Sequence, residues 1–154
     1  MSDHDPFASA PPALRQLLAL ASDLALAAGR IHAEGRRRAL TLETKSSATD
    51  IVSEVDREAE QLILERLRAE RPEDSLLAEE GGLLAGKSGV RWIVDPLDGT
   101  TNYVYGYPAY AASIAVEVDG VVVTGAVLDS SSGRLYRAIA GHGAVCGERR
   151  VHAR

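Results

Sequence analysis

The sequence lacks the features of a secreted or membrane-embedded protein. Cys146 is the single cysteine, so no disulfide can form within the chain. No apolar run approaches the roughly 20 residues that a membrane-spanning helix needs. The segment from Met1 to Pro6 has neither the basic start nor the apolar stretch of a signal peptide. We therefore expect a cytoplasmic protein without a membrane partner.

An excess of basic residues is also lacking. The formal net charge of −5 argues against a nucleic-acid partner held by bulk electrostatic attraction. Apolar residues make up 45% of the chain and charged residues 25%, as in an ordinary globular protein. A chain of 154 residues can bury a core without disulfides, so we expect one domain or a piece of a larger protein.

Hydrophobic periodicity predicts two long helices in the first half of the chain. Residues 1–11 are small, polar and proline-containing, and we expect this tail to be disordered, with a single domain over residues 12–154. An apolar stripe with steps of three and four residues begins after Pro12 and ends before Gly35, where glycine and three arginines predict a C-terminus. A second stripe between Ser53 and Arg71 predicts another helix.

The remaining segments favour strands. Residues 39–44 predict a short strand and residues 45–50 a polar loop. Asp119-Gly120 is the strongest hairpin signal, since this dipeptide suits a two-residue turn. The further predicted strands cover residues 75–78, 91–95, 110–118, 121–128 and 134–140. Two helices followed by an antiparallel run predict an α+β fold, with two long helices packed on an antiparallel sheet.

The stretch from Asp95 to Thr100 carries the candidate chemistry. A buried strand delivers Asp95 to its end, and Asp98 follows close enough for both carboxylates to face one site. Carboxylates, a hydroxyl and a peptide carbonyl are hard oxygen ligands, which suit Mg²⁺. Gly99-Thr100-Thr101 can open a short helical turn, and free backbone N–H groups at such a start hold phosphate well. The alternative is that Asp98-Gly99 is a simple turn and that Asp95 is a strand-end acid with local hydrogen bonds. An EF-hand loop fits badly, since counting from Asp95 puts Thr100 at the position that requires glycine.

Two further acidic positions strengthen the prediction of a metal site. Glu79 and Glu80 end another short strand, and Glu79 would meet Asp95 and Asp98 if the two strands pair. Such carboxylates cannot all stay ionised without added positive charge, and a divalent metal supplies it. Asp56 is either a helix cap or a group that accepts a proton through Thr100 to activate water. The alternative for Glu79 and Glu80 is a solvated strand end.

Together these segments resemble the inositol monophosphatase family of metal-dependent phosphatases. The resemblance extends from about Leu14 to Val151, essentially the whole chain, and one departure is Ala78, where the family usually has glycine. The matching segments are residues 92–103 (Trp-Ile-Val-Asp-Pro-Leu-Asp-Gly-Thr-Thr-Asn-Tyr), residues 50–56, residues 45–47, residues 78–80 and residues 141–144.

The resemblance implies a role for each matched residue. Glu79, Asp95 and the carbonyl oxygen of Leu97 would hold one Mg²⁺, and Asp95 with Asp98 a second. Glu80 would place a further metal or the water. Thr100, paired with Asp56, would orient the attacking water. The remaining implied roles are in substrate binding, by Asp98 and by the N–H groups of Gly99 and Thr100.

The resemblance also implies the fold, the reaction and the oligomeric state. We expect the N-terminal part of a layered αβαβα sugar-phosphatase fold, a homodimer, and hydrolysis of a phosphate monoester, with inositol monophosphate as first choice. Other sugar phosphates, histidinol phosphate or a nucleotide are alternatives within the family. Family members continue for roughly another hundred residues with a Trp-Asp signature, so this chain looks like an N-terminal half without the C-terminal domain.

Two readings from other classes compete with this one. A haloacid-dehalogenase-type phosphatase uses an aspartate nucleophile in Asp-x-Asp-Gly-Thr, but here two residues, Pro96 and Leu97, separate the aspartates. A truncated, catalytically silent regulatory protein would keep the fold without the activity. Intact acidic positions oppose the silent protein, and the missing second half supports it.

Overall fold

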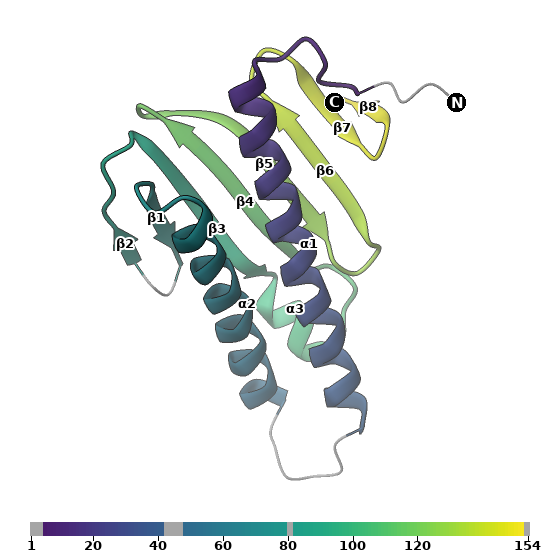
Figure 1. Ribbon diagram of the computed structural model, residues 1–154. Helices are drawn as coiled ribbons and strands as arrows, with labels where there is room; N and C mark the ends of the chain where they lie inside the picture. Colours follow the sequence, from purple (N-terminus) through teal and green to yellow (C-terminus); the bar gives the residue numbers. More distant parts are fainter. Residues whose placement is uncertain (1–4, 42–47, 80–81, 153–154) are drawn as a thin grey trace.

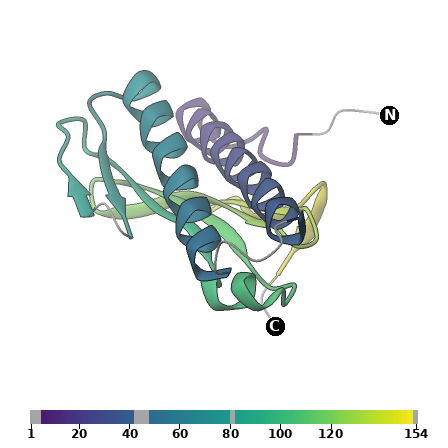
Figure 2. The same cartoon turned by 90° about the horizontal axis from the view of Figure 1, so that it is seen from below.

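Two helices pack on one face of an eight-stranded sheet. The computed structural model describes residues 5–41, 48–79 and 82–152. Helices α1 (Pro12–Thr41) and α2 (Ala48–Glu70) lie side by side, and both cover the same face of the sheet (Figures 1 and 2). The expected α+β architecture, with two long helices packed on a mostly antiparallel sheet, is confirmed.

The sheet is a meander with one parallel pair. Its spatial order is β2-β1-β3-β4-β5-β6-β7-β8, and among these described strands only β1 and β3 pair in parallel. The strands are β1 (Ser75–Ala78), β2 (Gly82–Leu84), β3 (Val90–Asp98), β4 (Ala111–Val118), β5 (Val121–Asp129), β6 (Arg134–Ile139), β7 (Gly143–Cys146) and β8 (Arg149–Val151). A short helix, α3 (Thr100–Tyr105), follows β3 at the lower end of the molecule in Figure 1. The hairpin at Asp119-Gly120 is confirmed, whereas β2, β7 and β8 were not predicted.

The main core lies between α1, α2 and the sheet. Small residues of the apolar stripe, such as Ala21, Ala25 and Ala28, are fully buried and let α1 approach the strands closely. Trp92 of β3 is also fully buried, and its indole Nε1 donates to Asp74 Oδ2 at 2.9 Å. The polar edge of this large aromatic group therefore keeps a hydrogen bond inside the core.

The boundaries of both helices differ from the prediction. Helix α1 continues through Gly35 to Thr41, so the predicted stop and the start of a strand at residue 39 are wrong; residues 42–47 lie outside the described residues. Gly35 serves close packing instead, because an added Cβ would meet a methyl group of Val55 and the hydroxyl of Tyr103. Helix α2 begins at Ala48, five residues before the predicted start.

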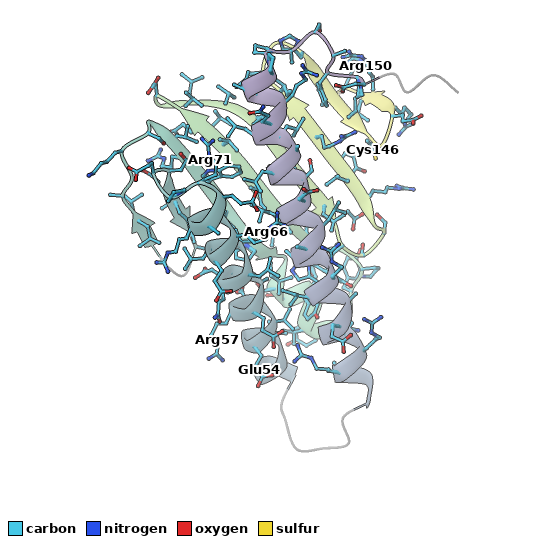
Figure 3. All side chains as sticks on the ribbon, viewed as in Figure 1. Glu54, Arg57, Arg66, Arg71, Cys146 and Arg150 are labelled. Atoms are coloured by element: carbon cyan, nitrogen blue, oxygen red, sulfur yellow. The ribbon has the colours of Figure 1, made fainter. Side chains whose placement is uncertain are left out.

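The described part of the N-terminal tail is ordered, which corrects the prediction for residues 5–11. Phe7 is 2% exposed and belongs to the main core. Arg150 Nη2 donates to the carbonyl of Pro6 at 3.2 Å, and Figure 3 shows this arginine at the end of the molecule opposite α3. One aromatic side chain and one arginine therefore fasten a segment whose composition is typical of disorder.

The second face of the sheet is open over β4 to β8. An apolar groove of about 420 Å³ lies there, and its lining includes Val123, Val127, Tyr136 and Val151. Helices α1 and α2 both lie on the opposite face of the sheet (Figure 2). Among the described residues, no helix combines the length and apolar character needed to span a membrane.

Candidate functional site

The parallel pairing of β1 and β3 brings two of the predicted acids together. Ala78 lies opposite Val94 in the ladder, so the following residues, Glu79 and Asp95, emerge at the same edge of the sheet. The sequence predicts an approach of Glu79 to Asp95 and Asp98 only if these two strands pair, and they do. Glu79 is exposed and Asp95 is half-buried.

A bulge in β3 sets the spacing between Asp95 and Asp98. Asp95 pairs with Ser113 and Asp98 with Ala111, so two residues on β3 oppose one on β4. Pro96 has no N–H to offer the ladder, which explains the interruption. The prediction that Pro96 ends the strand is wrong, since pairing resumes at Asp98.

The electrostatics of the site centre on Asp95. Burial raises its pKa to about 6, and the negative charges of Glu79 and Asp98, a hydrogen bond with Glu79 and the charge of Asp56 act in the same direction. Its Oδ1 atom is buried and has no hydrogen-bond partner among the described residues. The fold therefore gathers acids from α2, from the end of β1 and from β3 around one half-buried carboxylate.

The donor set of this site fits a hard divalent cation. It offers carboxylate oxygens and a peptide carbonyl, which are the ligands of Mg²⁺ in proteins. Within the described residues, no group of three or more His, Cys, Asp and Glu side chains already has the arrangement of a metal cluster. Glu80, which the prediction also invoked, and the matching segment 45–47 lie outside the described residues. The unpartnered Asp95 Oδ1 is the observation that favours a bound cation.

The turn into α3 places Gly99 and Thr100 beside the acids. Gly99 has φ 79°, and an added Cβ would lie 2.6 Å from the carbonyl oxygen of Ala109, so only glycine fits. Thr100 Oγ1 donates to the carbonyl of Leu97 at 3.0 Å. The pairing of Thr100 with Asp56 stays a prediction; Asp56 itself lies well inside α2 and not in its first turn.

A second, smaller core cluster buries one residue of the bulge, Leu97. It consists of Val52, Val55, Leu97 and Tyr103 and joins α2, β3 and α3. Leu97 is 1% exposed, so the carbonyl expected to hold a metal belongs to a residue anchored in this cluster. Burial of the Leu97 side chain fixes the backbone that separates the two aspartates.

Sequence reasoning missed His32, which reaches the bulge from α1. Its side chain is fully buried, with Nε2 at 2.9 Å from the carbonyl oxygen of Pro96 and Nδ1 at 2.8 Å from Ser130 Oγ. Burial lowers the pKa of His32 to about 4. The only signal in the sequence is its position four residues after Ala28, on the buried stripe of α1.

Comparison with known proteins identifies relatives over almost the entire chain. Residues 13–154 match the family model described as the inositol monophosphatase family. The inositol-1-monophosphatase of Mycobacterium leprae is 50% identical over 105 residues, which cover 65% of this chain and 36% of that protein. The Nus factor SuhB of Pasteurella multocida is 37% identical over 140 residues, which cover 90% of this chain and 52% of that protein.

A solved structure shares the architecture. The extragenic suppressor protein suhB from Bartonella henselae superposes with a TM-score of 0.79 at 35% identity, covering 90% of this chain and 55% of that one. The chain thus spans between about a third and a half of the length of the curated relatives named above.

Proposed function

The chain belongs to the inositol monophosphatase family, and we propose that it contributes to Mg²⁺-dependent hydrolysis of a phosphate monoester. The observation that carries this proposal is the half-buried Asp95: its Oδ1 has no hydrogen-bond partner among the described residues, and burial with the charges of Glu79 and Asp98 raises its pKa. We propose inositol monophosphate as the substrate, in line with the name of the relative from Mycobacterium leprae, inositol-1-monophosphatase.

Glu79, Asp95 and the carbonyl of Leu97 would hold one Mg²⁺, and Asp98 would join Asp95 at a second. When bound, Mg²⁺ acts as a Lewis acid toward phosphoryl oxygens and lowers the pKa of water. Glu80 would help to place a further ion or the water.

The remaining residues would position water and substrate. Thr100 would accept a hydrogen bond from the attacking water, and its pairing with Asp56 would require the hydroxyl to turn its proton from the Leu97 carbonyl to the Asp56 carboxylate. Leu97 has a carbonyl with two lone pairs, so its hydrogen bond from Thr100 leaves one free for a cation. The substrate phosphate would accept from the N–H groups of Gly99 and Thr100, with Asp98 beside it.

Calorimetry with Mg²⁺ tests the metal site independently of activity. Asp95→Asn should weaken Mg²⁺ binding at least about tenfold, because even outer-shell substitutions cost roughly 10–100-fold. Asp119→Asn is the matched control: this aspartate lies in the β4–β5 turn at φ 49°, a conformation that asparagine tolerates. Equal Mg²⁺ binding by the wild-type chain and Asp95→Asn would contradict the site assignment.

Phosphate release from inositol 1-phosphate, measured against Mg²⁺ concentration, tests the reaction. Release that depends on Mg²⁺ and is lost in Asp95→Asn supports the proposal. A parallel series with histidinol phosphate, a nucleotide monophosphate and a hexose phosphate ranks the alternative substrates. Mg²⁺ binding without release from any of them would favour the catalytically silent alternative.

We also propose that the chain forms a homodimer. This expectation rests on the family resemblance. Light scattering at micromolar concentration tests it, with a monomer mass as the contrary result.

A further inference from the structure

Two successive carbonyls of the β3 bulge each accept a hydrogen bond from a side chain. Thr100 Oγ1 donates to Leu97 at 3.0 Å, and His32 Nε2 lies 2.9 Å from the oxygen of Pro96. The bulge removes this stretch from regular pairing with β4. Buried backbone carbonyls need a partner, and here side chains supply it. The direction of each carbonyl between Asp95 and Asp98 is therefore fixed from outside the strand.

The partners of His32 determine its tautomer. A carbonyl oxygen can only accept, so Nε2 carries the proton and donates to Pro96. In a neutral ring Nδ1 must then accept, and the hydroxyl of Ser130 donates to it at 2.8 Å. Ser130 is itself held by its backbone N–H, which donates to the carbonyl of Tyr110 at 3.1 Å. Both ring nitrogens are therefore engaged, and the ring cannot turn without breaking one bond.

The backbone of His32 joins the same network. Tyr103 Oη donates to the carbonyl oxygen of His32 at 2.6 Å, so α1 and α3 are linked at this residue. One turn further along α1, Arg36 Nη1 donates to the carbonyl oxygen of Tyr103 at 2.9 Å. Helix α1 thus holds the bulge at Pro96 and the helix that follows it at Tyr103.

We propose that His32 is a positioning residue, which holds the Pro96 carbonyl and thereby sets the relative placement of the Asp95 and Asp98 carboxylates. This inference builds on the proposed function, since those carboxylates are the expected Mg²⁺ ligands. His32 touches neither the cation nor the substrate and acts through the backbone of the bulge. Ser130 is its partner in this role, because it fixes the nitrogen on the far side of the ring.

Hydrogen exchange of the EDTA-treated chain tests the placement without any metal. His32→Leu fills a similar volume but cannot donate a hydrogen bond to Pro96. The backbone amides of peptides covering residues 96–103 should therefore exchange faster, while those of residues 111–128 stay protected. His32→Gln can still offer an N–H to Pro96 and should restore slow exchange. If His32→Leu does not fold, Ser130→Ala provides the same test, since it frees one side of the ring.

Calorimetry with Mg²⁺ then links placement to the site. His32→Leu should weaken Mg²⁺ binding roughly tenfold or more, as for other residues that orient ligands, whereas His32→Gln should stay within about threefold. Ile139→Ala, in the main core, is the control for general destabilisation and should leave Mg²⁺ affinity unchanged.

The outcomes separate this inference from the proposed function. Unchanged exchange over residues 96–103 in both His32→Leu and Ser130→Ala overturns the positioning role, whatever the wild-type chain binds. Faster local exchange with no Mg²⁺ binding by the wild-type chain supports the positioning role and overturns the proposed metal site. Equal loss of Mg²⁺ affinity in His32→Leu and Ile139→Ala overturns the role, since it would then reflect stability alone.

Discussion

The two buried clusters of this molecule differ in what their side chains do. The main cluster lies between the two long helices and the sheet, and its members are hydrophobic residues, of which Trp92 also donates a hydrogen bond to Asp74. The smaller cluster of Val52, Val55, Leu97 and Tyr103 surrounds an irregular backbone and lies against buried polar groups, among them His32. The main cluster therefore stabilises the fold mostly through burial, whereas the residues around the smaller one also have to satisfy carbonyls that the bulge leaves outside the ladder.

This difference means that the stability of the fold and the geometry of the candidate site depend on different interactions. Burial is non-directional and roughly proportional to the apolar area removed from water. Hydrogen bonds depend on angle and distance, so they can fix the direction of a peptide. We therefore expect substitutions in the main cluster to lower the free energy of unfolding without changing the site. Substitutions around the smaller cluster should change the site as well.

The largest effect on stability is expected for Ile139→Ala. Ile139 is 1% exposed in the main cluster, and truncation of a buried isoleucine to alanine costs about 2–5 kcal/mol. Urea denaturation measures this loss, and a Mg²⁺ titration of the folded variant should match the wild-type chain. A parallel loss of Mg²⁺ affinity would show that the two clusters are not independent.

The next effect is a dependence of stability on pH that arises from His32. Its pKa falls from 6.5 to about 4 on folding because of burial, so between these values the unfolded chain binds a proton that the folded chain does not. Stability is therefore lost as pH falls from about 7 to 4, by up to about 3 kcal/mol at ~1.4 kcal/mol for each pKa unit. Asp95 acts oppositely: its raised pKa gives stability that is lost as pH rises through about 6.

A comparison with His32→Gln isolates the contribution of His32. Urea denaturation of both chains at pH 7, 5.5 and 4 should show that the variant loses less stability on acidification. The contribution of Asp95 is common to both chains and cancels in this difference. Parallel pH profiles of wild type and variant would contradict the prediction.

A smaller effect is expected when the helix glycines gain a methyl group. Gly35→Ala would press against Val55 and the hydroxyl of Tyr103, and overpacking of this kind costs roughly 1–3 kcal/mol. The higher helix propensity of alanine offsets about 1 kcal/mol of this cost. Denaturation and Mg²⁺ titration together check the result, since Gly35→Ala should weaken both stability and Mg²⁺ binding.

Gly29→Ala is the matched control on the same helix. Its added methyl group would clash with Leu128 of the main cluster and lie at an ordinary van der Waals distance, 3.6 Å, from Ser130 Oγ, so it should lower stability by a similar amount without displacing Ser130. Mg²⁺ affinity should stay at the wild-type value. If both variants changed Mg²⁺ binding equally, the distinction between the two clusters would fail.

The smallest effect on stability is expected for Thr100→Ala. The variant loses one hydrogen bond to Leu97, which contributes about 0.5–1.5 kcal/mol. Because Thr100 is proposed to orient water, phosphate release should fall more than Mg²⁺ affinity does. Thr100→Ser keeps the hydroxyl and should retain activity, and wild-type turnover in Thr100→Ala would contradict the role.

Much of the fold could be predicted because its signals are local. The apolar stripes gave both long helices, and Asp119-Gly120 gave the central hairpin. The end of α1 could not be predicted, because Gly35 packs against Val55 and Tyr103, which are distant in sequence. Phe7 likewise joins the core through contacts that no local pattern announces.

Part of the candidate site could likewise be predicted from the sequence, and part could not. Asp95 and Glu79 stood out as strand-end acids, and the parallel pairing of β1 and β3 brought them together as the prediction required. The sequence did not predict the bulge at Pro96 or the hydrogen bond from His32 to the Pro96 carbonyl. Both depend on which carbonyls lose their ladder partners when β3 pairs with β4. The position of a histidine on the apolar stripe of a helix does not predict which carbonyl its ring will hydrogen-bond.

The order of elements along the chain has a consequence for folding. Strands β3 to β8 follow one another in both sequence and space, so the meander forms through contacts that are mostly short in sequence separation. Helix α1, which carries His32, packs instead on β4, β5 and β6. During synthesis its apolar stripe emerges before these strands, and its burial is completed only after β6 has followed about a hundred residues later. The helix that holds the bulge in place thus depends on partners far along the chain, and interruption of synthesis before β6 would leave part of its apolar stripe exposed to aggregation.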